Sequence, residues 1–216
     1  TTNWYQIEIA QLRSSELVFL WYYEYGFARK KFQQRLILFN LEKKMRTPID
    51  GCKIEFSELA NNTLPEHFAR LEKNIQNPFS AAWIKEHGVG KKTLLKRLGR
   101  TADFPGCYVF IEEKNPIYVG ISRGVVARLY QHLTSNDHFS GSLAYYIAKR
   151  ENDPGGTRKE NMKNGDFRTL FEKSQKRLES CSVATVEISN AVELHLFEVY
   201  AAMELGTGEW NSFKTH

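Results

Sequence analysis

The chain has 216 residues, of which 42% are apolar and 25% are charged, enough to bury roughly two thirds of its unfolded surface in one or two domains. This composition excludes a disordered chain, a collagen-like fibre and a disulfide scaffold. The longest apolar run, residues 17–23, is far shorter than the ~20 residues that cross a bilayer. The three cysteines are scattered without a Cys-x-x-Cys pair, which argues against a zinc finger.

We expect an intracellular protein, cytoplasmic or nucleoid-associated in a bacterium, with no membrane partner. Because the chain begins at Thr1, we also expect a processed or partial chain.

Positive charge is concentrated in the first part of the chain. Residues 1–100 contain 17 Lys and Arg against 10 Asp and Glu, whereas residues 101–216 contain 13 against 15, so the net charges are +7 and −2. A cationic half attracts polyanions such as nucleic acid in a salt-dependent way. An ordinary solvated basic surface is the alternative.

Residues 1–100 are predicted to be mainly helical, and we interpret them as a basic region that could bind DNA. The apolar spacing predicts helices over about 14–26, over 27–45 and up to Ile75. The segment Gly88-Val89-Gly90-Lys91-Lys92 resembles the hairpin of the helix-hairpin-helix module. Glycine there would let the backbone approach a DNA phosphate closely. A plain two-glycine turn between helices is the alternative.

Downstream of residue 104 the pattern changes to period two, which predicts β-strands. Residues 106–111 and 117–121 form a hairpin with a polar turn, and residues 184–189 alternate as a third strand would. Tyr108 and Tyr118 both have even numbers. If the numbers of paired residues add up to an even number, as for 108 opposite 118, both phenols lie on one face of the sheet.

A helix is expected after the hairpin, with Ser122 as its cap. Its core stripe is formed by apolar residues at four-residue spacing, Val125, Leu129 and Leu133. Arg128 and His132, also four residues apart, share a different face. This face can present a cation and a titratable imidazole together.

A later helix carries a carboxylate in apolar surroundings. Ser189 or Asn190 can cap a helix over 191–205 that is apolar nearly all round, so we expect it to be buried. Glu198 lies in its middle without a fixed cation three or four residues away. Burial of this carboxylate is costly unless a metal ion compensates its charge. A hydrogen bond to His195, or a solvent-facing stripe, is the alternative.

Taken together, these residues resemble the GIY-YIG nuclease superfamily. The resemblance consists of Gly106-Cys107-Tyr108, Tyr118-Val119-Gly120, Arg128 and His132. The family also has a metal-binding Glu on a later helix and an Asn after it, which Glu198 and Asn211 match. The resemblance implies an α+β fold over 101–216, a small three-stranded antiparallel sheet flanked by helices, with a helical insertion at about 134–182.

The resemblance further implies a Mg²⁺- or Mn²⁺-dependent endonuclease acting on DNA, a stand-alone restriction or phage-defence nuclease. Tyr108 would take the proton of the attacking water, with its pKa lowered by Arg128 and the cation. Glu198 would bind the metal, and Arg128 would face the phosphate oxygens. Tyr118 and His132 would orient groups or relay protons, and Asn211 would support the other site residues or contact phosphate.

Other cations are predicted to contact DNA, and other functions stay open. Besides the hairpin, the expected DNA-binding residues are Arg123, Arg158 and Lys159, the last two in an insertion predicted as two helices and a loop. A solvated helix pair would explain these charges equally well. The alternative functions are a structure-specific repair or mobile-element nuclease, a non-catalytic nucleic-acid-binding module and an RNA-directed enzyme. A palindromic target would require a homodimer or tandem action.

Overall fold

The computed structural model describes residues 31, 33–35 and 47–214, and the chain divides into two compact units, Thr1–Pro48 and Ile49–His216. In the first unit residues 31 and 33–35 are helical, as predicted. The rest of that helix and the helix expected over 14–26 lie outside the described residues. Within the described part of the chain, no helix is long and apolar enough to cross a membrane.

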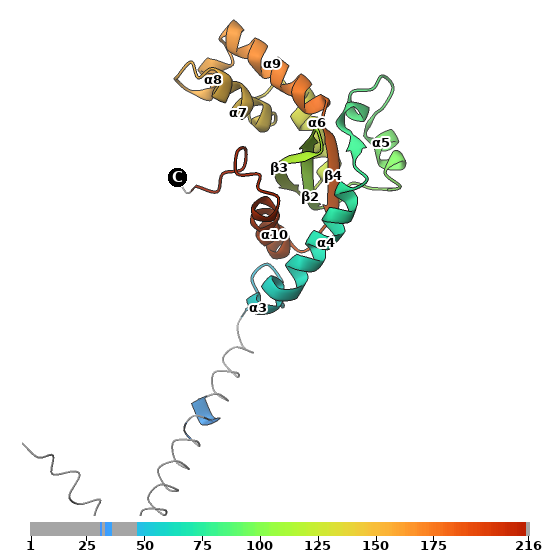
Figure 1. Cartoon of the computed structure of the whole chain (residues 1–216), viewed down its shortest axis with the longest axis vertical. Helices are drawn as coiled ribbons and strands as arrows, with labels where there is room; N and C mark the ends of the chain where they lie inside the picture. The colour runs from blue at the N-terminus through green and yellow to red at the C-terminus, as the bar shows by residue number, and fades with distance from the viewer. Residues whose placement is uncertain (1–30, 32, 36–46, 215–216) are drawn as a thin grey trace, which may run out of the picture. The chain divides into compact units, whose positions relative to one another are not determined.

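The second unit is built on an antiparallel sheet with the strand order β1-β4-β2-β3 (Figure 1). The strands are β1 (Phe79–Ser80), β2 (Gly106–Glu112), β3 (Asn115–Ser122) and β4 (Ser182–Glu187). An α+β fold with an antiparallel sheet is confirmed, but the expected number of three strands is wrong. The additional strand β1 pairs with β4 through only two residues, too few to show an alternating pattern.

The register of the β2–β3 hairpin places both tyrosines on one face of the sheet, as predicted. Tyr108 lies opposite Gly120 and Phe110 lies opposite Tyr118, so the residue sum is even and both phenols share a face. Glu113 and Lys114 form a two-residue turn and both have positive φ, the backbone of a type I′ hairpin turn.

Helices cover both faces of the sheet (Figure 1). They are α3 (Phe56–Glu58), the π-helix η1 (Leu59–Thr63), α4 (Leu64–Ile75), the 3₁₀-helix η2 (Ala81–Ile84), α5 (Lys91–Arg97), α6 (Val125–Thr134), α7 (Ser142–Glu151), α8 (Arg158–Asn161), α9 (Gly165–Glu179) and α10 (Ala191–Glu204). The insertion therefore contains three helices, α7 to α9, where two were expected. The short α8 owes its start to a capping box between Thr157 and Glu160.

Alternation along β2 creates two separate cores. Tyr108 and Phe110 pack into a core with the buried residues of α6, α7 and α9. Cys107 and Val109 point to the opposite face, where α4 and α10 cover them. Residues 49–100 thus contribute β1, α4 and α5 to the same unit as the sheet.

Helices α10 and α6 are capped in different ways, one by a neighbouring residue and the other by a residue distant in the sequence. Asn190 caps α10 as predicted, because its side-chain oxygen accepts from the Val192 and Glu193 amides at 2.9 and 3.1 Å. The expected cap of α6 by Ser122 is wrong. Asp103 instead accepts from the Val126 and Ala127 amides, both at 2.9 Å.

Helix α10 is only partly buried, contrary to the expectation from its composition. Leu194, Phe197 and Ala201 pack in the core, whereas Val199 is 38% and Met203 76% exposed. The helix contacts the sheet and α4 along one side. Apolar residues on its other side remain on the surface.

Leu71→Ala tests whether α4 is integral to this unit. Leu71 is fully buried, and α4 is also tied to the sheet by the Asn74 side chain, which donates to the Thr185 carbonyl at 2.8 Å. We expect a loss of about 2–5 kcal/mol in the free energy of unfolding, measured by urea denaturation. The exposed neighbour provides the control, Glu72→Ala, which should be near neutral. An unchanged midpoint for Leu71→Ala would contradict this packing.

Candidate active site

Two phenols and an imidazole meet on one face of the sheet. The hydroxyl of Tyr108 on β2 lies 2.7 Å from Nε2 of His132 on α6, and both side chains are buried. The Tyr118 ring on β3 lies 6.3 Å from the Tyr108 ring and 6.1 Å from His132, between ring centroids. The structure thus brings together three of the predicted site residues.

Glycine is required where the Tyr108 ring crosses β3. A Cβ on Gly120, which lies opposite Tyr108 in the hairpin, would collide with Cζ and the hydroxyl of that tyrosine. Gly106 is equally constrained, since its Cβ would collide with the Val186 carbonyl oxygen on β4. Both glycines of the sequence motif therefore have a packing reason.

Burial keeps this cluster uncharged at neutral pH. Desolvation, with a contribution from Arg128, lowers the pKa of His132 to about 3. Desolvation raises the pKa of Tyr108 well above its usual value, and together with nearby Glu198 it raises the pKa of Tyr118 to about 12. Arg128 does lower both phenol pKa values, but burial outweighs it, so the expected lowered pKa of Tyr108 is wrong for the protein without ligands.

The imidazole keeps one nitrogen without a partner. Among the residues that the structure describes, no group hydrogen bonds to the buried Nδ1 of His132. When Nδ1 carries the proton, Nε2 accepts from the Tyr108 hydroxyl. This hydrogen bond then fixes the orientation of both rings.

Arg128 holds the start of α7 beside this cluster. Its guanidinium donates to the Ser140 carbonyl and the Ser142 hydroxyl, both at 2.9 Å, and to Gln131 Oε1 at 3.1 Å. A guanidinium has five N–H donors, and Arg128 also has a side-chain hydrogen bond with Tyr108, so one donor is left for a further acceptor. Arg128 is half-buried and lies near both phenols, whose pKa values it lowers.

A pocket of about 1050 Å³ lies at the free β3 edge of the sheet. Its walls come from β3, α7, α10 and the C-terminal loop, and include Tyr118, Tyr146, Glu198, Trp210, Asn211 and Phe213. Tyr118 belongs to the face covered by α6, whereas α10 packs on the other face. The pocket therefore forms where the two helical layers meet at the strand edge.

The Glu198 carboxylate has no partner in this pocket. No hydrogen bond or ion pair joins it to any described residue, including His195, so the alternative of a Glu198–His195 hydrogen bond is not realised. Desolvation raises the pKa of Glu198, and the His195 charge only partly opposes this. An external cation would relieve the cost of the ionised carboxylate.

These residues fit a hydrated divalent ion better than a protein cage. Within residues 47–214 and the described part of the first unit, no cluster of three His, Cys, Asp or Glu side chains could hold a metal. Mg²⁺ keeps several of its waters and commonly binds one or two carboxylates. Glu198, partnerless and open to the pocket, suits that mode.

The Asn211 side chain is bonded to the backbone of β3. Its Oδ1 accepts from the Val119 amide at 2.9 Å, and its Nδ2 donates to the Val119 carbonyl at 2.7 Å. The side chain thus pairs with the exposed edge of β3 as a neighbouring strand would. Asn211 anchors the C-terminal loop beside the pocket, and its amide is already engaged before a phosphate arrives.

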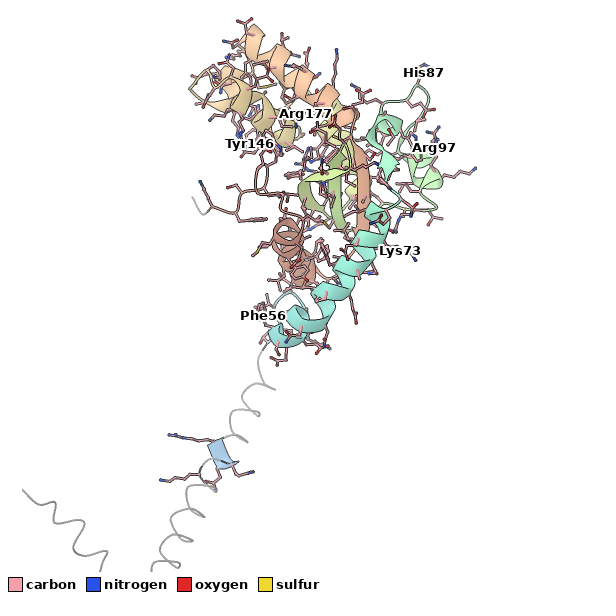
Figure 2. The ribbon with its side chains drawn as sticks, viewed as in Figure 1. Phe56, Lys73, His87, Arg97, Tyr146 and Arg177 are labelled. Atoms are coloured by element: carbon pink, nitrogen blue, oxygen red, sulfur yellow. The ribbon has the colours of Figure 1, made fainter. Side chains whose placement is uncertain are left out.

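The predicted hairpin lies far from the pocket. Gly88 has positive φ, and the turn is fixed by the Tyr130 hydroxyl, which donates to the Val89 carbonyl at 2.9 Å. It follows β1, the edge strand opposite β3, and none of its residues lines the pocket. The labelled His87 and Arg97 flank this region, opposite Tyr146 on α7 (Figure 2).

The other predicted DNA-binding side chains differ in their exposure and in whether they bond to other side chains. Lys91, Lys92, Arg123 and Lys159 are exposed and form no ion pair with the described residues. Arg158 is half-buried instead, with its guanidinium bonded to the Tyr146 hydroxyl. Arg158 therefore supports an aromatic side chain of the pocket.

Several pocket residues were not among the predicted site residues. Tyr146 and Arg150 come from the insertion, and Trp210 and Phe213 come from the C-terminal loop. The Arg150 guanidinium lies 5.0 Å from the Trp210 ring centroid, which joins the two segments. In the sequence, the aromatic residues Trp210 and Phe213 beside Asn211 are the only signal that could have indicated that this loop lines a pocket.

Comparison with known proteins found no matching family model, no similar curated protein and no similar solved structure.

Gly120→Ala tests the close approach of Tyr108 to β3. The added Cβ must displace the Tyr108 ring and weaken its hydrogen bond to His132, so we expect a loss of about 1–3 kcal/mol in unfolding free energy. Urea denaturation measures the loss, and near-ultraviolet circular dichroism reports the aromatic packing. Gly165→Ala is the control, because that Cβ meets no atom. Equal stability of the two variants would refute the constraint.

The low pKa of His132 predicts an acid-sensitive fold. The unfolded imidazole titrates near ~6.5 and the folded one near about 3, so unfolding takes up a proton and stability falls as pH drops between these values. His132→Leu should lose about 1–3 kcal/mol at pH 7, because the Tyr108 hydroxyl loses its partner. Its further loss between pH 7 and pH 4 should be smaller than in the wild type. Parallel pH profiles of urea midpoints would argue against this.

Proposed function

We propose that the protein is a divalent-metal-dependent endonuclease that hydrolyses DNA phosphodiester bonds, acting as a stand-alone restriction or phage-defence nuclease. One observation carries the proposal. Tyr118 and the partnerless carboxylate of Glu198 line the same open pocket, with Arg128 and the Tyr108–His132 hydrogen bond beside them. A phenol, a guanidinium and an uncompensated acid suit a phosphate and a cation better than a neutral ligand.

In this proposal Tyr118 and Glu198, which line the pocket, lie nearest the substrate, with Arg128 beside them. Glu198 would hold one Mg²⁺ or Mn²⁺, which when bound supplies charge compensation for the phosphate and lowers the pKa of its water. Arg128 has an unused donor for a nonbridging phosphate oxygen. The Tyr118 hydroxyl keeps its proton at neutral pH, because its pKa is about 12, and it can donate to the phosphate or to the attacking water.

Tyr108 and His132 are buried behind the residues that line the pocket. In hydrolysis the water oxygen forms a bond to phosphorus as the bond to the leaving oxygen breaks, and the water proton must go to a base. Solvent at the open pocket takes that proton, because the buried Tyr108–His132 pair stays uncharged, and the Tyr118 hydroxyl can give its own proton to the leaving oxygen. The Tyr108 hydroxyl, bonded to His132 Nε2 at 2.7 Å, keeps in place the ring against which Tyr118 packs. Because Tyr108 is buried, we assign it a positioning role.

DNA binding is supported by the exposed cations. Lys91, Lys92 and Arg123 lie on the unit that carries the pocket, and they are available to phosphates. Such contacts release counterions, so affinity should fall steeply with salt. A duplex would have to lie across the unit to reach both the hairpin and the pocket, since these are at opposite sheet edges. Exposed aromatic rings in the pocket favour a second candidate, a structure-specific nuclease.

Glu198→Ala should abolish Mg²⁺-dependent nicking of supercoiled plasmid while DNA binding in EDTA survives. Loss of one electrostatic element in a site of this kind costs about 3–4 kcal/mol of transition-state stabilisation, or 10²–10³ in rate. The measurements are plasmid relaxation with Mg²⁺ or EDTA and an electrophoretic binding assay. Nicking retained by this variant would contradict the metal assignment.

Glu198→Gln separates a catalytic defect from an unfolded protein. The folded pKa of Glu198 is raised, so its ionisation at higher pH costs folding free energy. Glutamine removes the charge at nearly the same volume, and the melting temperature at pH 8 should therefore equal or exceed that of the wild type. Such a variant should be folded and inactive. An active Glu198→Gln protein would refute a role for the carboxylate.

A further inference from the structure

Two half-exposed aromatic rings line the pocket from different segments. Tyr146 on α7 is 48% exposed and Phe213 in the C-terminal loop is 49% exposed. In Figure 2 Tyr146 lies on α7 on the side of the C-terminal loop. Rings of this size usually bury their surface against other residues. Here both leave half their surface open beside Glu198 and Tyr118.

The Tyr146 ring is held in place before any ligand arrives. Its hydroxyl is bonded to Arg158, whose guanidinium carbon lies 5.0 Å from the ring centroid. Tyr145, which is buried, packs against it edge-on with 6.2 Å between ring centroids. Preorganisation of this kind lowers the entropic cost of binding a flat ligand.

The Phe213 ring is attached close to a fixed point. Asn211, two residues earlier, is bonded to both backbone groups of Val119 on β3. Trp210 packs against the core that contains Tyr108 and Phe110, and it lies near the Arg150 guanidinium. The loop therefore presents Phe213 from the strand edge, across the same pocket as Tyr146.

The charges around these rings suit a nucleotide better than an apolar peptide. Lys149 and Arg150 line the pocket in exposed ion pairs with Asp153 and Glu209, at 3.4 and 3.5 Å. Exposed pairs of this kind are weak, so a phosphate can replace the carboxylates. Lys214 lines the pocket without an ion pair to the described residues. Aromatic faces with nearby cations form the usual surface for single-stranded nucleic acid.

We infer that Tyr146 and Phe213 stack on an unpaired nucleobase next to the scissile phosphate, so that the preferred substrate is DNA with an unstacked or readily extruded base. This inference rests on the proposed nuclease function and specifies its substrate class. In a regular duplex both faces of each base are covered by neighbouring bases, and only an unpaired base offers a face to a protein ring at low cost. A pocket of about 1050 Å³ has room for a base beside a phosphate.

The test compares two duplexes that are identical except for one unpaired 2-aminopurine, whose fluorescence is quenched by stacking. Binding is measured in EDTA, where no cleavage is expected. The wild type should bind the duplex with the unpaired base more tightly and quench its fluorescence. Tyr146→Ala should weaken that binding about tenfold, abolish the quenching and leave the fully paired duplex unaffected. Tyr146→Phe, which keeps the ring, should retain most of the preference.

Phe56→Ala is the matched control, because Phe56 on α3 is 67% exposed and does not line the pocket. It should bind both duplexes as the wild type does. If Tyr146→Ala and Phe213→Ala both keep the preference and the quenching, the stacking inference is wrong, even if plasmid nicking through Glu198 is demonstrated. If the wild type neither binds DNA nor nicks plasmid, the proposed function fails together with the inference.

Discussion

The hydrogen bond between Tyr108 and His132 is the contact on which the rest of the site depends. It lies between a strand and a helix in a dry core, where each group would be costly without the other. It forms only because Gly120 lets the tyrosine ring cross the neighbouring strand. The Tyr118 ring then packs against both partners and reaches the pocket. A backbone constraint in the hairpin thereby determines where the Tyr118 phenol reaches the pocket.

The position of the pocket follows from the layering of the fold. Alternation along the strands sends Tyr118 toward α6 and other residues toward α10, so the two layers meet only at the strand edge. Glu198 reaches this edge from α10, and Asn211 closes the strand where it would otherwise expose unpaired backbone groups. The ionised carboxylate of Glu198 has no partner among the described residues, and its burial therefore lowers stability.

Local patterns predicted much of this structure, and long-range contacts account for what they missed. Parity alone placed Tyr108 and Tyr118 on one face, and the Asn190 cap follows from its own neighbourhood in the chain. The Asp103 cap of α6 depends on a residue that is distant in sequence, so no local spacing reveals it. Arg158 shows the same limit, because its charge predicted a DNA contact and only the folded insertion shows that it binds Tyr146.

The most direct test of the account is where a divalent ion binds. Mn²⁺ titrated into isotope-labelled protein broadens the amide signals of residues near the ion. We expect selective broadening around Tyr118, Glu198 and Asn211, reversed by excess Mg²⁺ and absent in Glu198→Gln. Broadening that leaves these residues untouched, or that persists without the carboxylate, would contradict it.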